Sequence, residues 1–191
     1  FLYGASAGSS GAVDTSSVES LKDVFEAEGF EVNPTLWDFY AGRENQFRNG
    51  LNIEVPVVEY PQEVLDSFAG YGDAAVIVLS RGGQEAMDMA EGSLGLTEDE
   101  TAMIAMVNDS FDNIVVLLNT ANPMELGWMN DYANIKACIW AGFPGQFGIT
   151  AIPQILNGTE NPSGKLVDTY AYSFLNSPAM SNFGSGMIEN G

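Results

Sequence analysis

The chain of 191 residues contains no histidine, a single cysteine and only six lysine and arginine residues. The lack of histidine excludes Ser-His-Asp triads and most zinc sites. The one cysteine, Cys138, forms no internal disulfide and has no histidine to activate it, so we expect a small buried hydrophobic residue rather than a catalytic thiol. Since no stretch approaches about 18 consecutive apolar residues, no membrane span is expected.

Basic residues are few against 26 aspartates and glutamates, which gives a formal net charge of −20. A chain of this charge repels nucleic-acid phosphates and anionic membranes, so neither is an expected partner. The acidity serves solubility, or alternatively attracts cations. Apolar residues make up 46% of the chain, a globular composition with enough length for one sizeable domain. Because the chain opens at Phe1 without a start Met or signal peptide, we expect it to come from inside a longer protein or to have been trimmed.

Short apolar runs alternate with helical patterns along the chain. This alternation predicts an α/β fold, a three-layer sandwich with a mostly parallel central sheet of about six strands and helices on both faces. The expected strands lie at residues 1–3, 30–32, 74–79, 113–119 and 135–140, with a last one after Leu166. The expected helices run from Ser16 or Ser17 to Glu28, from Pro34 to Tyr40, from Pro61, from the capping box at Thr97, from Pro123 to Met129 and from Gly148 to Leu156. Residues 41–54 are polar, and we expect an irregular surface excursion there.

The segment Ser80–Asp88 directly follows a buried apolar run, at the end of a strand where open α/β sheets bind ligands. It carries two carboxylates, Glu85 and Asp88, and without histidine acid/base chemistry falls to groups such as Glu85. Protonation of a glycosidic oxygen needs a carboxylic acid of raised pKa and a second carboxylate from elsewhere. A solvated surface loop is the alternative interpretation. Arg81 either pairs with Asp88 and fixes the loop, or binds a ligand hydroxyl.

Two glycine-rich stretches follow other expected strands. The loop Gly4–Gly11, which contains Ser9 and Ser10, could present backbone N–H groups to a phosphate, but it lacks the lysine of a P-loop. A tight turn or a sugar-facing loop is the favoured interpretation. The stretch Gly142–Gly148 predicts a turn that lines a crevice.

Taken together, these motifs resemble the α/β sandwich domain of glycoside hydrolase family 3, the β-glucosidase and β-xylosidase family. The resemblance covers nearly the whole chain. The matching motifs are Ser80-Arg81 with Glu85 and Asp88, Leu96–Glu100, Val115–Asn119 with Asn122-Pro123, Trp140–Gln146, and Asn161–Leu166 with Thr169. The last of these is similar to a specific signature of the family, with Val167 in place of the usual proline.

The resemblance implies a retaining mechanism with two carboxylates on two domains. We expect no cofactor and no metal. An aspartate nucleophile lies on a (β/α)₈ barrel, and the general acid/base of the sandwich domain corresponds to Glu85. Gln84 and Ala86 replace the glycines that usually flank this glutamate. Arg81 and Asp88 match residues that shape the loop, and Ser9 and Ser10 lie in a loop similar to the family's Gly/Ser loop.

We therefore expect residues 1–175 to form the sandwich domain and residues 176–191 to be a tail or linker toward a further domain. The expected partners are a β-glucoside or related oligosaccharide and the barrel of the parent protein, and the chain alone is expected to be inactive. Two alternatives remain open: a non-catalytic carbohydrate-binding or interface module of the same fold, and a flavodoxin-like phosphate or nucleotide binder.

Overall fold

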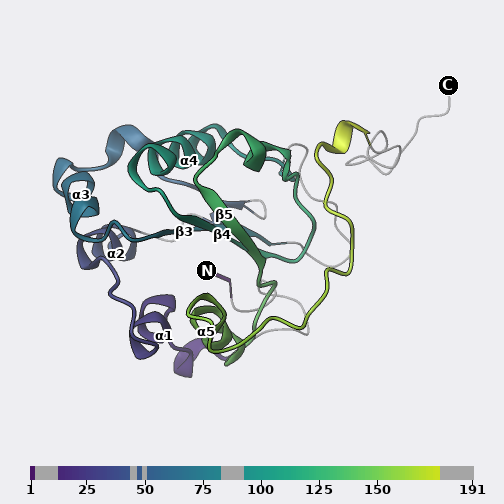
Figure 1. Cartoon of the computed structure of the whole chain (residues 1–191), viewed down its shortest axis with the longest axis horizontal. Helices are drawn as coiled ribbons and strands as arrows, with labels where there is room; N and C mark the ends of the chain where they lie inside the picture. Colours follow the sequence, from purple (N-terminus) through teal and green to yellow (C-terminus); the bar gives the residue numbers. More distant parts are fainter. Residues whose placement is uncertain (3–12, 44–46, 49–50, 83–92, 177–191) are drawn as a thin grey trace.

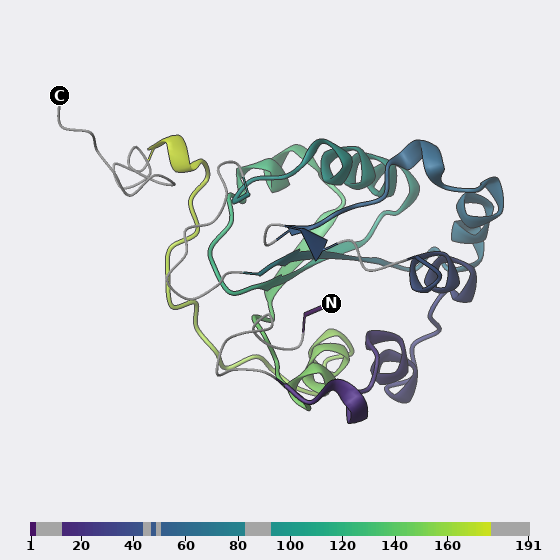
Figure 2. The same cartoon turned by 180° about the vertical axis from the view of Figure 1, so that it is seen from behind.

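A mixed β-sheet lies between two layers of helices (Figures 1 and 2). This computed structural model describes residues 1–2, 13–43, 47–48, 51–82 and 93–176. The α-helices are α1 (Leu21–Ala27), α2 (Pro34–Ala41), α3 (Gln62–Ser67), α4 (Glu98–Ser110) and α5 (Ala151–Leu156). Short 3-10 helices lie at η1 (Thr15–Ser17), η2 (Val57–Glu59), η3 (Phe68–Gly70), η4 (Gly127–Asp131), η5 (Gly148–Thr150) and η6 (Phe174–Asn176). No described helix is long and apolar enough to cross a membrane. The predicted α/β class, with helices on both faces of a sheet, is confirmed.

The sheet has the strand order β1-β2-β3-β4-β5. Its strands are β1 (Phe47–Arg48), β2 (Leu51–Asn52), β3 (Ala75–Arg81), β4 (Ile114–Thr120) and β5 (Ile135–Trp140). Only β3, β4 and β5 are parallel, whereas β1 and β2 form an antiparallel hairpin that meets the end of β3. The expectation of about six mostly parallel strands is thus wrong for the described residues, which form five. The stretch expected to be an irregular excursion supplies the hairpin.

The two central strands have buried side chains on both faces, which explains their continuous apolar sequences. On one face Ile77 and Leu79 of β3 pack with Val116 and Leu118 of β4 against α3 and α4. On the other face Leu117 of β4 belongs to a second apolar cluster beneath α1 and α5. Figure 1 shows α3 and α4 on one side of the sheet and α1 and α5 on the other.

Helix caps decide where two of the helices begin. The predicted capping box of α4 is confirmed: the Thr97 Oγ1 accepts from the Glu100 N–H at 3.1 Å, and the Thr97 N–H donates to Glu100 Oε2 at 2.9 Å. The predicted start of α1 at Ser16 or Ser17 is wrong, because Ser20 forms the capping box, with Asp23. The helix ends as expected before Gly29, whose φ of 88° a residue with a Cβ adopts only at a cost.

Three further expectations are wrong. Residues 30–32 and 167–173 form no strand, and residues 123–126 form no helix. The physical reason is clear for the last of these: the amides of Glu125 and Leu126 donate to Leu94 O and Ala171 O, far away in sequence, instead of to carbonyls one turn earlier. The expected strand at residues 1–3 lies partly outside the described residues, and its described part, Phe1 and Leu2, is in no strand.

Candidate functional site at the carboxyl end of the sheet

The carboxyl ends of the parallel strands bring buried polar side chains to one edge of the sheet. Ser80 and Arg81 end β3, and Asn119 and Thr120 end β4 in register with them. All four are at most 2% exposed. Ligands of open α/β sheets bind at this edge, so we regard it as the candidate site.

Asn119 connects this edge to two loops. Its Oδ1 accepts from the Ser80 hydroxyl at 3.0 Å and from the backbone N–H of Leu2. Its Nδ2 donates to Leu2 O at 2.8 Å and to Gly142 O at 2.7 Å. Phe1 and Leu2, which directly precede the undescribed residues 3–12, are therefore held at the end of β4.

Arg81 is completely buried, and all five of its N–H donors are used within the described residues. Its Nη1 and Nη2 bind Glu100 Oε1 and Oε2 side by side, at 2.8 and 2.7 Å. The remaining bonds go to three backbone carbonyls: Nε to Ser93 O at 2.8 Å, Nη2 to Gly95 O at 2.8 Å and Nη1 to Ser80 O at 3.0 Å. A guanidinium so satisfied has no donor left for a ligand.

These bonds close the base of the segment that contains Glu85. Arg81 lies at the end of β3, just before the segment, while Ser93 and Gly95 lie just after it. Glu100, on the first turn of α4, adds a third attachment, and its Oε2 also accepts from the Thr97 amide. Because both charges are buried and paired in a two-bond geometry, the two ends of the segment are held to each other and to α4.

Four of the five predicted site residues lie outside the described residues: Glu85 and Asp88 in 83–92, and Ser9 and Ser10 in 3–12. Arg81 has Glu100 as its carboxylate partner, which the sequence had not indicated. Two features of the sequence could have identified Glu100: it is the N3 residue of a capping box, and it precedes the apolar face of α4. Among the described residues, no group of three or more Cys, Asp or Glu side chains could hold a metal ion.

Cys138 lies on the edge strand β5 and is exposed, so the expectation of a buried residue is wrong. Its side chain nevertheless lines a small apolar cavity of about 110 Å³, together with Leu118, Leu126, Trp140, Leu166 and Tyr170. Desolvation in this surrounding raises the pKa of the Cys138 thiol to about 11. A thiol of this pKa is almost entirely protonated near neutral pH, which argues against a nucleophilic role.

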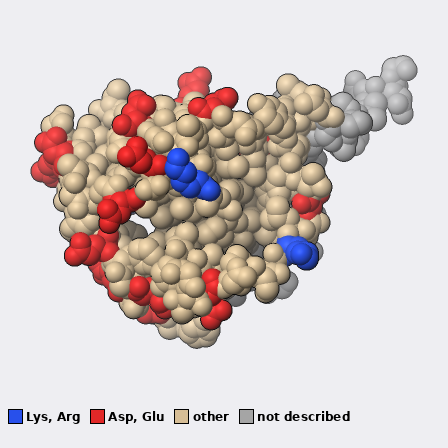
Figure 3. Space-filling model, viewed as in Figure 1, with Lys and Arg blue, Asp and Glu red and all other residues tan. Residues whose placement is uncertain are grey.

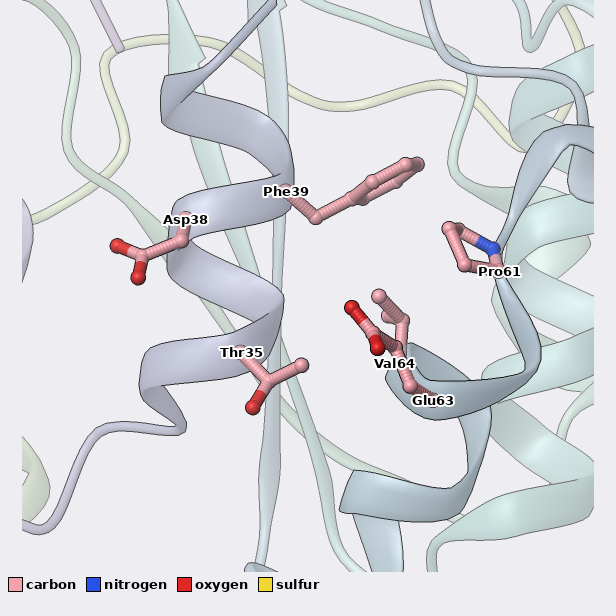
Figure 4. Close-up of a pocket in the computed structure, with 6 residues that line it drawn as sticks. All are labelled: Thr35, Asp38, Phe39, Pro61, Glu63 and Val64. Atoms are coloured by element: carbon pink, nitrogen blue, oxygen red, sulfur yellow. The ribbon is translucent and has the colours of Figure 1, made fainter.

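A cavity of about 410 Å³ lies between α2 and α3 (Figure 4). Its lining residues are Thr35, Asp38, Phe39, Pro61, Glu63 and Val64. In Figure 4 the Asp38 carboxylate points away from the gap between the helices. Figure 1 places α2 and α3 away from the carboxyl ends of β3–β5, so this cavity is separate from the candidate site.

The distribution of charged side chains also differs between the two sides of the molecule in the view of Figure 3. Figure 3 shows acidic side chains gathered over the helices at the left of the view and along its lower margin. The side on which the chain returns after α5 shows few charges of either sign. In this view, most acidic side chains of the described residues therefore lie away from the side on which the chain returns after α5.

Comparison with known proteins extends these observations. The chain is 29% identical over 192 residues to a beta-glucosidase of Ruminococcus albus, covering 95% of this chain and 20% of the relative. A beta-glucosidase A of Butyrivibrio fibrisolvens is 30% identical over 166 residues, covering 73% of this chain and 20% of that protein. The chain thus spans about a fifth of the length of these relatives.

Solved structures show the same fold. A beta-glucosidase from Paenibacillus barengoltzii superimposes with a TM-score of 0.82 at 29% identity, over 97% of this chain and 21% of that one. Beta-glucosidase 3B from Thermotoga neapolitana, solved with glucose, shares the fold at a TM-score of 0.76 and 24% identity, over 94% and 27% of the two chains. The model of the glycosyl hydrolase family 3 C-terminal domain matches residues 4–186. The chain therefore belongs to glycosyl hydrolase family 3, as a C-terminal domain of that family.

Proposed function

We propose that this chain is the acid/base-carrying domain of a retaining β-glycosidase of the β-glucosidase type, with Glu85 as proton donor and acceptor. The observation that carries the proposal is the anchored base of the Glu85 segment. Arg81 joins the end of β3 to Ser93 and Gly95 and pairs with Glu100, at the edge of the sheet where α/β folds bind ligands. Membership of family 3 supplies the chemistry that we assign to the segment anchored there.

In the first step, the protonated Glu85 carboxyl donates its proton to the glycosidic oxygen. An aspartate of a barrel domain meanwhile bonds to the anomeric carbon, and the alcohol leaves. In the second step, the Glu85 carboxylate takes a proton from water as the water oxygen attacks the anomeric carbon and releases the aspartate. Proton transfer of this kind contributes about 10²–10⁴-fold to a rate.

A retaining site needs its two carboxyl groups only about 5–5.5 Å apart. In the proposed arrangement this chain supplies one of them and the barrel of a longer protein supplies the other. The isolated chain should therefore not hydrolyse an aryl β-glucoside, measured by release of nitrophenol. Turnover by the pure chain would contradict the two-domain arrangement.

The role of Glu85 is tested in the longer protein that carries the barrel. Glu85→Gln should slow turnover of substrates with poor leaving groups, and added azide should restore turnover of substrates with good ones by yielding a glycosyl azide. Glu91→Gln, in the same segment, is the matched control. Normal turnover of poor leaving groups by Glu85→Gln would exclude Glu85 as the acid.

A non-catalytic binding or interface module remains the second candidate, because Gln84 and Ala86 replace two glycines beside Glu85. This candidate predicts that the longer protein binds a β-glucoside without hydrolysing it. Isothermal titration with intact substrate, followed by product analysis, separates the two functions.

A further inference from the structure

Residues 166–176, called the strap below, return along the carboxyl edge of the sheet after α5 (Figures 1 and 2). They bind the stretch Glu125–Gly127 through both backbone and side chain. The amides of Leu126 and Gly127 each donate at 3.1 Å, to Ala171 O and Tyr172 O. The Glu125 Oε1 accepts from the Phe174 amide at 2.6 Å and from the Ser173 hydroxyl at 3.3 Å.

Gly127 is the point of closest approach between the two stretches. A Cβ at this position would lie 2.7 and 2.8 Å from the ring carbons Cδ1 and Cε1 of Tyr172, and closer still to its backbone oxygen. Gly127 is not among the glycines of positive φ, so the requirement for glycine here is one of space. Any side chain at Gly127 must push the strap away.

Glu125 connects the strap to the segment of Glu85. While its carboxylate holds Ser173 and Phe174, its own amide donates to Leu94 O at 2.8 Å. Leu94 lies between Ser93 and Gly95, whose carbonyls Arg81 binds. The stretch 93–95 is thus held from β3 on one side and from the strap on the other. Met124, fully buried beside Glu125, fixes the connection in the core.

We propose that Gly127 and Glu125 are positioning residues, through which the strap holds the returning end of the Glu85 segment in place for proton transfer. The inference rests on the proposed role of Glu85. It makes the strap part of the machinery that aims the general acid, although no strap residue touches the reacting atoms. A displaced strap then weakens protonation of the leaving group, because acid catalysis depends steeply on the placement of the donor.

Amide exchange of this chain tests the physical connection. Gly127→Ala should raise the hydrogen-exchange rates of the backbone amides at positions 126, 127 and 174 by about fivefold or more. The exchange rate of the Glu125 amide should rise as well. Gly164→Ala is the control, because a Cβ there meets nothing within 4 Å. The inference would be overturned if the amides that bind the strap exchanged faster while the exchange rate of the Glu125 amide stayed the same.

Kinetics of the longer protein test the consequence. For poor leaving groups, Gly127→Ala and Glu125→Ala should lower kcat/KM by about tenfold to a hundredfold. Dinitrophenyl glucosides, which need no acid, should change little. Glu125→Gln should retain most activity because its Oε1 still accepts from Phe174, which keeps the test usable if Gly127→Ala fails to fold.

An equal loss of kcat/KM for all leaving groups would show a merely structural role and overturn the inference. If Glu85→Gln itself shows no dependence on the leaving group, the proposed function fails instead, and the exchange data still decide the connection.

Discussion

The buried ion pair of Arg81 and Glu100 joins the end of β3 to the first turn of α4. Both side chains are almost wholly removed from water, so each depends on the other for compensation of its charge. Through the bonds of Arg81 to Ser93 O and Gly95 O, the pair also ties the residues on either side of 83–92 to the first turn of α4.

Arg81→Ala should lower the free energy of unfolding by about 3–5 kcal/mol, because it leaves Glu100 buried without a partner. Urea unfolding followed by circular dichroism measures this. Arg43→Ala is the control, since Arg43 pairs with the half-exposed Glu59 and should cost no more than about 1 kcal/mol. Equal losses in the two variants would show that the buried pair does not anchor the fold.

Glu54 is a second residue with a distinctive environment, which shifts the pKa of its carboxyl group. Its Oε1 accepts from the Tyr40 hydroxyl at 2.7 Å and from the Val55 amide at 2.8 Å, and Tyr40 also contacts the Tyr60 hydroxyl. Burial raises the pKa of Glu54 above its ordinary value of 4.5, and the hydrogen bonds from Tyr40 and Val55 oppose the shift only in part. The Glu100 carboxylate raises this pKa further.

Because its pKa is raised on folding, Glu54 binds its proton more tightly in the folded chain. Its contribution to stability is therefore present below pH 4.5 and is lost as pH rises through the higher folded pKa. Glu54→Gln should remove this part of the pH dependence, measured as the free energy of unfolding in urea from pH 4 to pH 8. Glu63→Gln controls for the loss of one exposed charge. A Glu54→Gln profile parallel to that of the unchanged chain would contradict the burial argument.

At the scale of elements, α4 joins the site to the core. Its apolar face, with Met103, Ile104 and Val107, packs on the sheet, while its first turn holds Glu100. The capping box therefore stabilises the helix and positions the partner of Arg81 at once.

Thr97→Ala should lower the free energy of unfolding by about 1 kcal/mol, because it removes the acceptor of the Glu100 amide. Thr101→Ala, on the exposed side of the same helix, should change it by no more than about 0.5 kcal/mol. Urea unfolding of both variants checks the difference, and equal effects would contradict the assigned cap.

The sequence predicted β3, β4, β5 and the α4 cap because these depend on local patterns of apolar and capping residues. It failed where tertiary contacts overrule local preference. Pro123 predicted a helix start, but the following amides bind Leu94 O and Ala171 O, which are distant in the chain. Cys138 was expected to be buried because its strand is apolar, and nothing in the strand indicated that it lies at the edge of the sheet.

In the candidate site, too, local patterns predicted some features, whereas features that depend on tertiary contacts were missed. The position of Arg81 at the end of a strand followed from periodicity, but its partner Glu100 lies 19 residues away and only folding brings the two together. The link from the strap through Glu125 to Leu94 is likewise a tertiary feature. The family resemblance, now confirmed by a match over residues 4–186, supplied what local patterns could not: a specific role for Glu85 to test.

At the scale of the whole molecule, the charge of −20 gives the folded chain a strong self-repulsion. Raising NaCl from about 10 to about 150 mM should therefore raise the Tm, because the Debye length falls from about 30 to about 8 Å. Calorimetry at pH 7 measures this, with an equal osmolality of sucrose as the uncharged control. A Tm unchanged by salt would show that repulsion is already compensated in the fold.

The central claim, that Glu85 protonates the leaving group, is tested most directly by the dependence of kcat/KM on leaving-group pKa in the longer protein. Glu85→Gln should make this dependence much steeper than in the unchanged enzyme, with losses of about 10²–10⁴-fold for the poorest leaving groups and little change for dinitrophenol. Parallel plots for the two proteins would contradict the claim.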